Sequence, residues 1–194
     1  MSDMALETAK KCLRIQDVWL HQSLAWMAED FDPKFPQAGH YIAQHKHHVA
    51  RATFGELTDD DTPQAGYLFR VYLDLGLRLL PAESGVSPDD DTTTHDSGVA
   101  ASIEATFVAE YVSAVDPGEA AINAFALRNA SYHVWPFWRE FVVNHCERMR
   151  LPRVMIPTMS LAPTEGIAAG KDGLESDQTN CNPLVWDRML SSRH

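Results

Sequence analysis

The densest group of side chains that could do chemistry is a histidine cluster in the stretch GHYIAQHKHHVAR, with His40, His45, His47 and His48. On a strand, His45 and His47 would share a face and could bind a metal ion with a third ligand from elsewhere. No carboxylate or thiolate stands nearby at ligand spacing, so we interpret the cluster as a solvated strand end. We therefore expect no metal ion there.

The cysteines do not indicate catalysis either. Cys12, Cys146 and Cys181 are odd in number and far apart, which is typical of reduced thiols in the cytosol. His145 precedes Cys146, but neighbours in sequence do not face each other on a helix, so we expect a core cysteine there. The chain has no phosphate-binding glycine loop, nucleophile elbow, Cys-x-x-Cys pair or zinc-protease motif. We expect that it is not an enzyme.

The charge balance restricts the partners. Twenty-seven acidic residues against 16 basic ones give a net charge of −11, which disfavours nucleic acid and anionic lipid. The hydrophobic content of 45% is typical of a globular protein, and no apolar run is long enough to span a membrane. The N-terminus has no secretory-signal pattern, so we expect a cytoplasmic protein without membrane insertion.

The elements that must position any site begin with strands. Residues 67–80 alternate apolar and other side chains almost without error, which predicts a long strand with one buried face. Residues 99–111 repeat the pattern, and further strands are expected over 12–27 and about 47–57, with a loop over 81–98. Four strands with short returns predict one antiparallel sheet that is apolar on one side.

A helical run follows the strands. Asp116 is expected to cap it, with Pro117 in the first turn, and Asn129 and Pro136 should break or kink it. A 3.6-residue period predicts an apolar stripe of Val134, Phe137, Trp138, Phe141, Val142, His145 and Met149. The fold class is therefore α+β, with a long kinked helix on one face of the sheet. One domain is expected over 1–161, and 162–194 should be a linker with a short helical tail.

The stretch SYHVWPFWREFVVNHCERMRLPR, residues 131–153, resembles the signature of the SecB family of chaperones and its relatives in toxin–antitoxin systems. The matching positions are Val134, Trp135, Pro136, Phe137, Arg139 and Glu140 in the helix, followed by Leu151 and Pro152. The order of strands before helix over about 12–161 agrees with this resemblance, as does Ile15–Gln16 in the first strand.

The resemblance implies a homotetramer, built as a dimer of dimers, in which the helix packs between sheets of neighbouring subunits. Trp135, Pro136, Phe137, Arg139 and Glu140 would then be structural or lie near a subunit interface. The resemblance also implies a cofactor-free holdase, which keeps unfolded or nascent polypeptides in apolar grooves for export or for a dedicated client such as an antitoxin. The alternative is an adaptor on the same fold with one fixed partner.

Two departures point to a specialised relative. Gln22 and Trp26 stand about where export-type members carry the acidic residues that dock the translocase motor. A Gly/Ala-rich linker also stands where the family's second helix should begin, and only residues 182–190 could replace that helix. The expected client contacts are exposed aromatics outside the signature, for which subunit packing is an equal alternative: Trp19, Trp26, Phe35 and Tyr41.

Overall fold

A four-stranded antiparallel sheet forms the main layer of the computed structural model, which describes residues 2–34, 41–59, 62–81, 98–159 and 186–188. The strands are β1 (Arg14–Met27), β2 (Tyr41–Asp59), β3 (Thr62–Pro81) and β4 (Ala101–Ser113). A short fifth strand, β5 (Trp186–Arg188), pairs in parallel with β2, so the order is β1-β4-β3-β2-β5. The helices are α1 (Ser2–Cys12), α2 (Glu119–Arg128) and α3 (Ala130–Met149).

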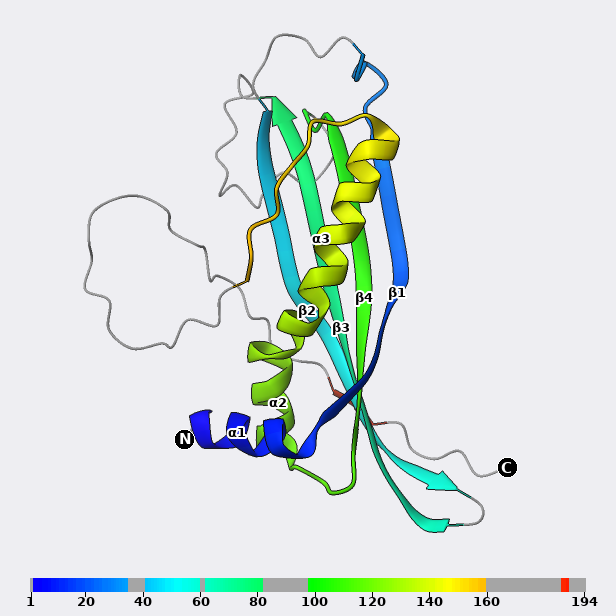
Figure 1. Ribbon diagram of the computed structural model, residues 1–194, viewed down its shortest axis with the longest axis vertical. Helices are drawn as coiled ribbons and strands as arrows, with labels where there is room; N and C mark the ends of the chain where they lie inside the picture. The colour runs from blue at the N-terminus through cyan, green and yellow to red at the C-terminus, as the bar shows by residue number, and fades with distance from the viewer. Residues whose placement is uncertain (1, 35–40, 60–61, 82–97, 160–185, 189–194) are drawn as a thin grey trace, which may run out of the picture.

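Helix α3 lies along one face of the sheet, and α1 and α2 lie together at its lower end (Figure 1). The predicted α+β class and antiparallel sheet are confirmed. We call the sheet face that carries α3 the helix face, and the other the open face. On β3 and β4 the alternation places these buried side chains on the helix face: Phe69, Val71, Leu73, Leu75, Leu77 and Leu79, with Ala101, Ile103, Ala105, Phe107, Ala109 and Tyr111.

The first two strands differ from their predicted bounds. Residues 2–12 form α1, which the sequence pattern did not predict, so β1 begins at Arg14. Leu6 and Ala9 of α1 are buried in the core, which explains why an otherwise polar helix is held in place. Strand β2 begins at Tyr41 rather than near residue 47. Residues 82–97 of the predicted loop lie outside the described residues.

The helical run is bent at Asn129, which ends α2 and precedes α3. Helix α3 continues through Pro136, although a break or kink was also expected there. Pro136 is exposed, so the hydrogen bond that it cannot donate lies on the solvent side of the helix, where its loss is least costly. The predicted Asp116 cap is wrong. Its Oδ1 instead accepts a hydrogen bond from the Gly118 N–H at 2.8 Å, before α2 begins at Glu119.

Val134, Trp138, Val142 and Cys146 form the buried row of α3. The expected stripe is wrong at Phe137, which is 45% exposed because it points about a quarter turn away from Trp138 around the helix. After Arg150, residues 151–159 run back beside α3 without joining the sheet (Figure 1). Most of 162–194 lies outside the described residues, but Trp186–Arg188 are a strand where a helix was expected.

Candidate functional site

The outermost long strand, β1, carries a row of uncovered apolar side chains. Only β4 pairs with β1 among the described residues, so its other edge has no strand beside it. The ladder places Ile15 opposite Tyr111, Leu20 opposite Phe107 and Met27 opposite Ala101, which are helix-face residues of β4. Ile15, Leu20 and Met27 are nevertheless 44%, 42% and 37% exposed. The helix face of the sheet is therefore only partly covered along β1, where Val18 packs against the core but Ile15, Leu20 and Met27 stay exposed.

Phe137 of α3 extends this row. Phe141 packs edge-on against Phe107 of β4, with ring centroids 5.8 Å apart, and Leu20 is the β1 partner of Phe107. Phe137 lies one turn before Phe141 on the same flank of α3, so it points towards the β1 side. We call Ile15, Leu20, Met27 and Phe137 together the β1 strip. It offers an apolar surface beside a free strand edge, which suits an extended polypeptide.

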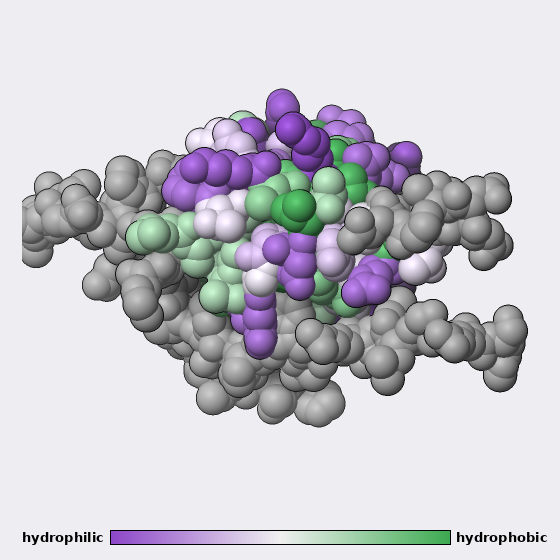
Figure 2. Space-filling model, turned by 90° about the horizontal axis from the view of Figure 1, so that it is seen from below, coloured by the Kyte–Doolittle hydropathy of each residue, from purple (hydrophilic) through white to green (hydrophobic). Residues whose placement is uncertain are grey.

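A hollow of about 310 Å³ lies at the lower end of the strip, where α1, β1 and α3 meet. Figure 2 shows the molecule from this end, with apolar residues gathered near its middle and hydrophilic ones around them. Tyr111 lines the hollow, and its hydroxyl forms a hydrogen bond with His133 Nδ1 at 2.9 Å. Burial raises the pKa of Tyr111 and lowers the pKa of His133, so both groups are neutral at physiological pH. The other lining residues are Lys10, Leu13, Ile15, Phe125, Asn129 and Tyr132.

The open face of the sheet is chemically different, because ion pairs cross it. Their N–O distances are 2.7 Å for Arg70–Glu110, 3.1 Å for Arg78–Glu104 and 3.6 Å for Lys46–Glu104. Burial by itself would raise the pKa of Glu104. The hydrogen bond from Arg78, the charges of Lys46 and Arg78 and the hydrogen bond from Ser102 outweigh burial, so the net effect is a lowered pKa. Arg51 also lies 3.5 Å above the Tyr72 ring. The open face is therefore charged across β2, β3 and β4, and its exposed apolar side chain on β1 is Leu24.

The structure describes three of the four predicted client contacts and does not bring these three to one site. Trp19 and Trp26 pair with Val108 and Ser102, so both lie on the open face, and Trp19 sits beside Arg70, 5.7 Å from its guanidinium carbon. Tyr41 starts β2 and packs edge-on against Phe31 at 5.6 Å. Phe35 lies outside the described residues. Sequence reasoning missed the β1 strip because two bulges, between Ile15 and Asp17 and between Leu20 and Gln22, interrupt the alternation.

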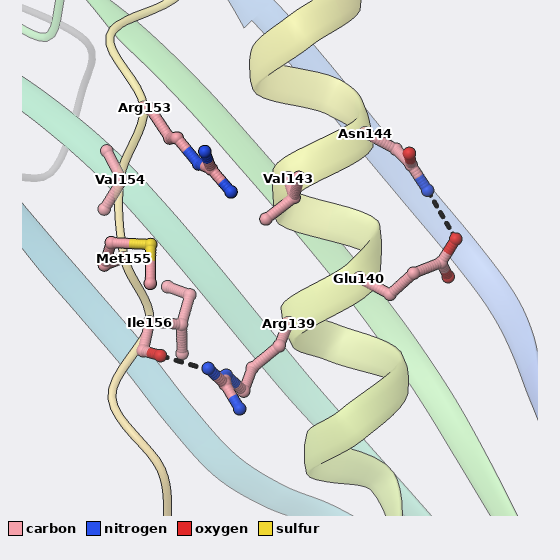
Figure 3. A pocket seen from close by; sticks show the side chains of 8 residues that line it. All are labelled: Arg139, Glu140, Val143, Asn144, Arg153, Val154, Met155 and Ile156. Atoms are coloured by element: carbon pink, nitrogen blue, oxygen red, sulfur yellow. Dashed lines mark hydrogen bonds between the residues drawn. The ribbon is translucent and has the colours of Figure 1, made fainter.

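Two of the helix signature residues, Trp135 and Arg139, hold the chain that follows α3. Trp135 Nε1 donates to the Pro157 carbonyl at 2.7 Å, and Arg139 Nε donates to the Ile156 carbonyl at 3.0 Å. Glu140 accepts a hydrogen bond from Asn144 within the helix. A second hollow, of about 260 Å³, lies between α3 and residues 153–156 (Figure 3).

The histidines of the cluster have structural contacts. His45 and His47 share the helix face, as predicted, and His47 Nε2 lies 2.7 Å from Ser131 Oγ and edge-on to Trp135. Burial lowers the pKa of both histidines, and the charge of His48 lowers that of His47 further. His40 is outside the described residues. No group of three or more metal-ligating side chains gathers in the described part of the chain.

The cysteines give no sign of activation. Cys146 is buried, and this burial raises the pKa of its thiol despite a backbone hydrogen bond from Val154. Cys12 is half-buried, and Cys181 falls among the residues that the structure does not describe. A thiol with a raised pKa is a poor nucleophile, so the predicted role of Cys146 as a core residue agrees with its surroundings.

Comparison with solved structures is informative about the fold. No protein-family model matches the chain, and none of the curated proteins does. The solved structure of a SecB-like chaperone, Rv1957 of Mycobacterium tuberculosis, in complex with a ChAD peptide from the antitoxin HigA1, superposes with a TM-score of 0.57. At 19% identity the alignment covers 83% of this chain and 99% of that one. The chain therefore has a SecB-like fold.

A protein of unknown function from Streptococcus agalactiae also matches, with a TM-score of 0.33 and 7% identity over 75% of this chain and 96% of that one, too distant to support an argument. Among the described residues, no helix has the length and apolar character needed to cross a membrane.

Proposed function

We propose that this chain is an ATP-independent chaperone that binds extended segments of non-native polypeptide along the β1 strip. The observation that carries the proposal is the uncovered apolar row of Ile15, Leu20 and Met27 on a free edge strand of a SecB-like fold. An unfolded segment could add its backbone to the edge and bury its apolar side chains against the strip. Such binding needs little sequence specificity and no catalytic group.

The client is best described as a dedicated one. The SecB-like neighbour is bound to a peptide of an antitoxin, which supports an antitoxin-like client for this chain as well. A role in export through a translocase motor is the second possibility within the same function, and Gln22 and Trp26 disfavour it because neither supplies a carboxylate for docking. Trp19, Trp26, Phe35 and Tyr41 stay proposed as additional client or subunit contacts.

We place the chaperone in the cytoplasm as a homotetramer. The helix signature supports this assembly, because the resemblance puts the Arg139–Glu140 step near the contacts between subunits, and the β1 strip is left for the client. The residues 1–161 would form the folded unit of each subunit.

The proposal is tested by whether the purified protein suppresses light scattering from thermally unfolding citrate synthase and binds a fluorescein-labelled apolar peptide. Leu20→Ser should weaken peptide binding roughly fivefold, because about 1 kcal/mol of apolar burial is lost. Leu24→Ser is the matched control: Leu24 is also exposed on β1, but it pairs with Glu104 on the open face. We expect this variant to bind within twofold of the native protein.

If Leu20→Ser and Leu24→Ser weakened peptide binding equally, the binding site would not be the β1 strip. Failure of the native protein to bind any unfolded chain, with tight capture of a single folded partner, would replace the chaperone by a fixed-partner adaptor.

A further inference from the structure

The hollow between α3 and the following segment is lined by two arginines and by apolar side chains. Arg139 and Val143 come from α3, and Arg153, Met155 and Ile156 come from the segment beside it. Figure 3 shows the Arg153 side chain reaching towards Val143 and Arg139 reaching towards Ile156, so both guanidinium groups border the gap. Val143 and Ile156 supply apolar walls, and Met155, which is 66% exposed, lies at the rim.

No carboxylate neutralises these arginines within the described residues. Arg139 uses its Nε to hold the Ile156 carbonyl, which fixes the guanidinium while its other N–H donors stay unused in the described structure. Arg153 is exposed and makes no hydrogen bond or ion pair with a described residue. Glu140 belongs to the lining, but its carboxylate bonds Asn144 on the opposite side of α3 (Figure 3). Two cations that line one hollow without a counter-charge among the described residues are unusual in a chain with a net charge of −11.

We propose that this hollow binds a carboxylate flanked by an apolar side chain in the client polypeptide. The inference rests on the proposed chaperone function and names the chemistry of its client. A guanidinium binds a carboxylate through paired, charge-assisted hydrogen bonds, and the apolar walls would cover the adjoining side chain of the ligand. The carboxylate can come from an Asp or Glu side chain or from the C-terminus of the client.

Three labelled peptides of one apolar sequence test this in the full-length protein. The first carries one internal Glu and an amidated C-terminus, the second replaces that Glu with Gln, and the third carries Gln with a free C-terminal carboxylate. We expect the Glu peptide to bind about fivefold more tightly than the amidated Gln peptide, with the advantage shrinking at high salt. Tighter binding of the third peptide alone would identify a chain end as the natural source of the carboxylate.

Arg153→Gln should abolish the preference for the carboxylate and leave binding of the amidated Gln peptide unchanged. Arg148→Gln is the control, because Arg148 is exposed on α3 but does not line the hollow. Equal binding of all three peptides, or a preference that survives Arg153→Gln, would overturn this inference and leave the chaperone function standing. Binding of none of them would count against the proposed function itself.

Discussion

The two flanks of α3 differ in how they are covered. On one flank, residues 151–159 lie against the helix, and Trp135 and Arg139 donate hydrogen bonds to carbonyls of that segment. On the other flank none of the described residues covers Phe137, which is 45% exposed on the β1 side. Because Trp135 and Arg139 bind backbone carbonyls, they could hold this segment against α3 whatever side chains it carried. The open flank needs a partner from outside, either a client segment or another subunit.

The largest effect on stability should come from truncating Trp138, which lies in the buried row of α3 between the two flanks. Trp138→Ala deletes a side chain that is 1% exposed in the core, so we expect the free energy of unfolding to fall by about 3–5 kcal/mol. Phe137→Ala removes a neighbouring aromatic from the open flank and should cost far less. Urea unfolding followed by tryptophan fluorescence and circular dichroism measures both. Equal losses would show that Phe137 is buried in solution.

A smaller loss of stability should come from removing one hydrogen bond on the covered flank of α3. Trp135→Phe keeps an aromatic ring but loses the Nε1 hydrogen bond to the Pro157 carbonyl, so we expect a loss of about 1 kcal/mol. Amide exchange should quicken in residues 151–159 while β3 and β4 stay protected. Unchanged exchange in that segment would mean that Trp135 does not hold it.

The smallest effect concerns pH. Burial lowers the pKa of His45, His47 and His133 from the ordinary value of 6.5, so the unfolded chain binds more protons than the native one below about pH 6.5. Stability should therefore fall as the pH drops from 6.5 towards 5. His47→Gln, which can still reach Ser131, should make this slope shallower in urea titrations at several pH values. An unchanged slope would assign the pH dependence to other groups.

The sequence predicted the parts of the fold whose burial follows a simple period. Strands β3 and β4 are buried on the helix face along most of their length, so their alternation was clear. Helix α1 escaped prediction because only a few of its residues, such as Leu6 and Ala9, are buried, and its stability depends on packing. The bend was assigned to both Asn129 and Pro136, but an exposed proline is compatible with a continuous helix.

The candidate site was harder to predict than the fold. Its residues are apolar but exposed, which composition alone cannot distinguish from core residues. Phe137 belongs to the signature stretch, yet only the rotation of α3 relative to the sheet decides whether it is covered. The arginine-lined hollow depends on the path of residues 151–159, and nothing in that sequence shows that it turns back along α3.

The two bulges of β1 have a further consequence for how this surface can change. Gln16 and His21 are the residues without a partner on β4, so each is one extra residue in an otherwise regular ladder. Deleting His21 would make the ladder regular there and keep the pairs that follow, with Ser23 and Ala25 on the helix face and Leu24 and Trp26 on the open face. A one-residue deletion, which elsewhere in a strand moves the following side chains to the opposite face, would here leave the β1 strip in place. Related chains could thus differ in length at either bulge and keep the same client surface.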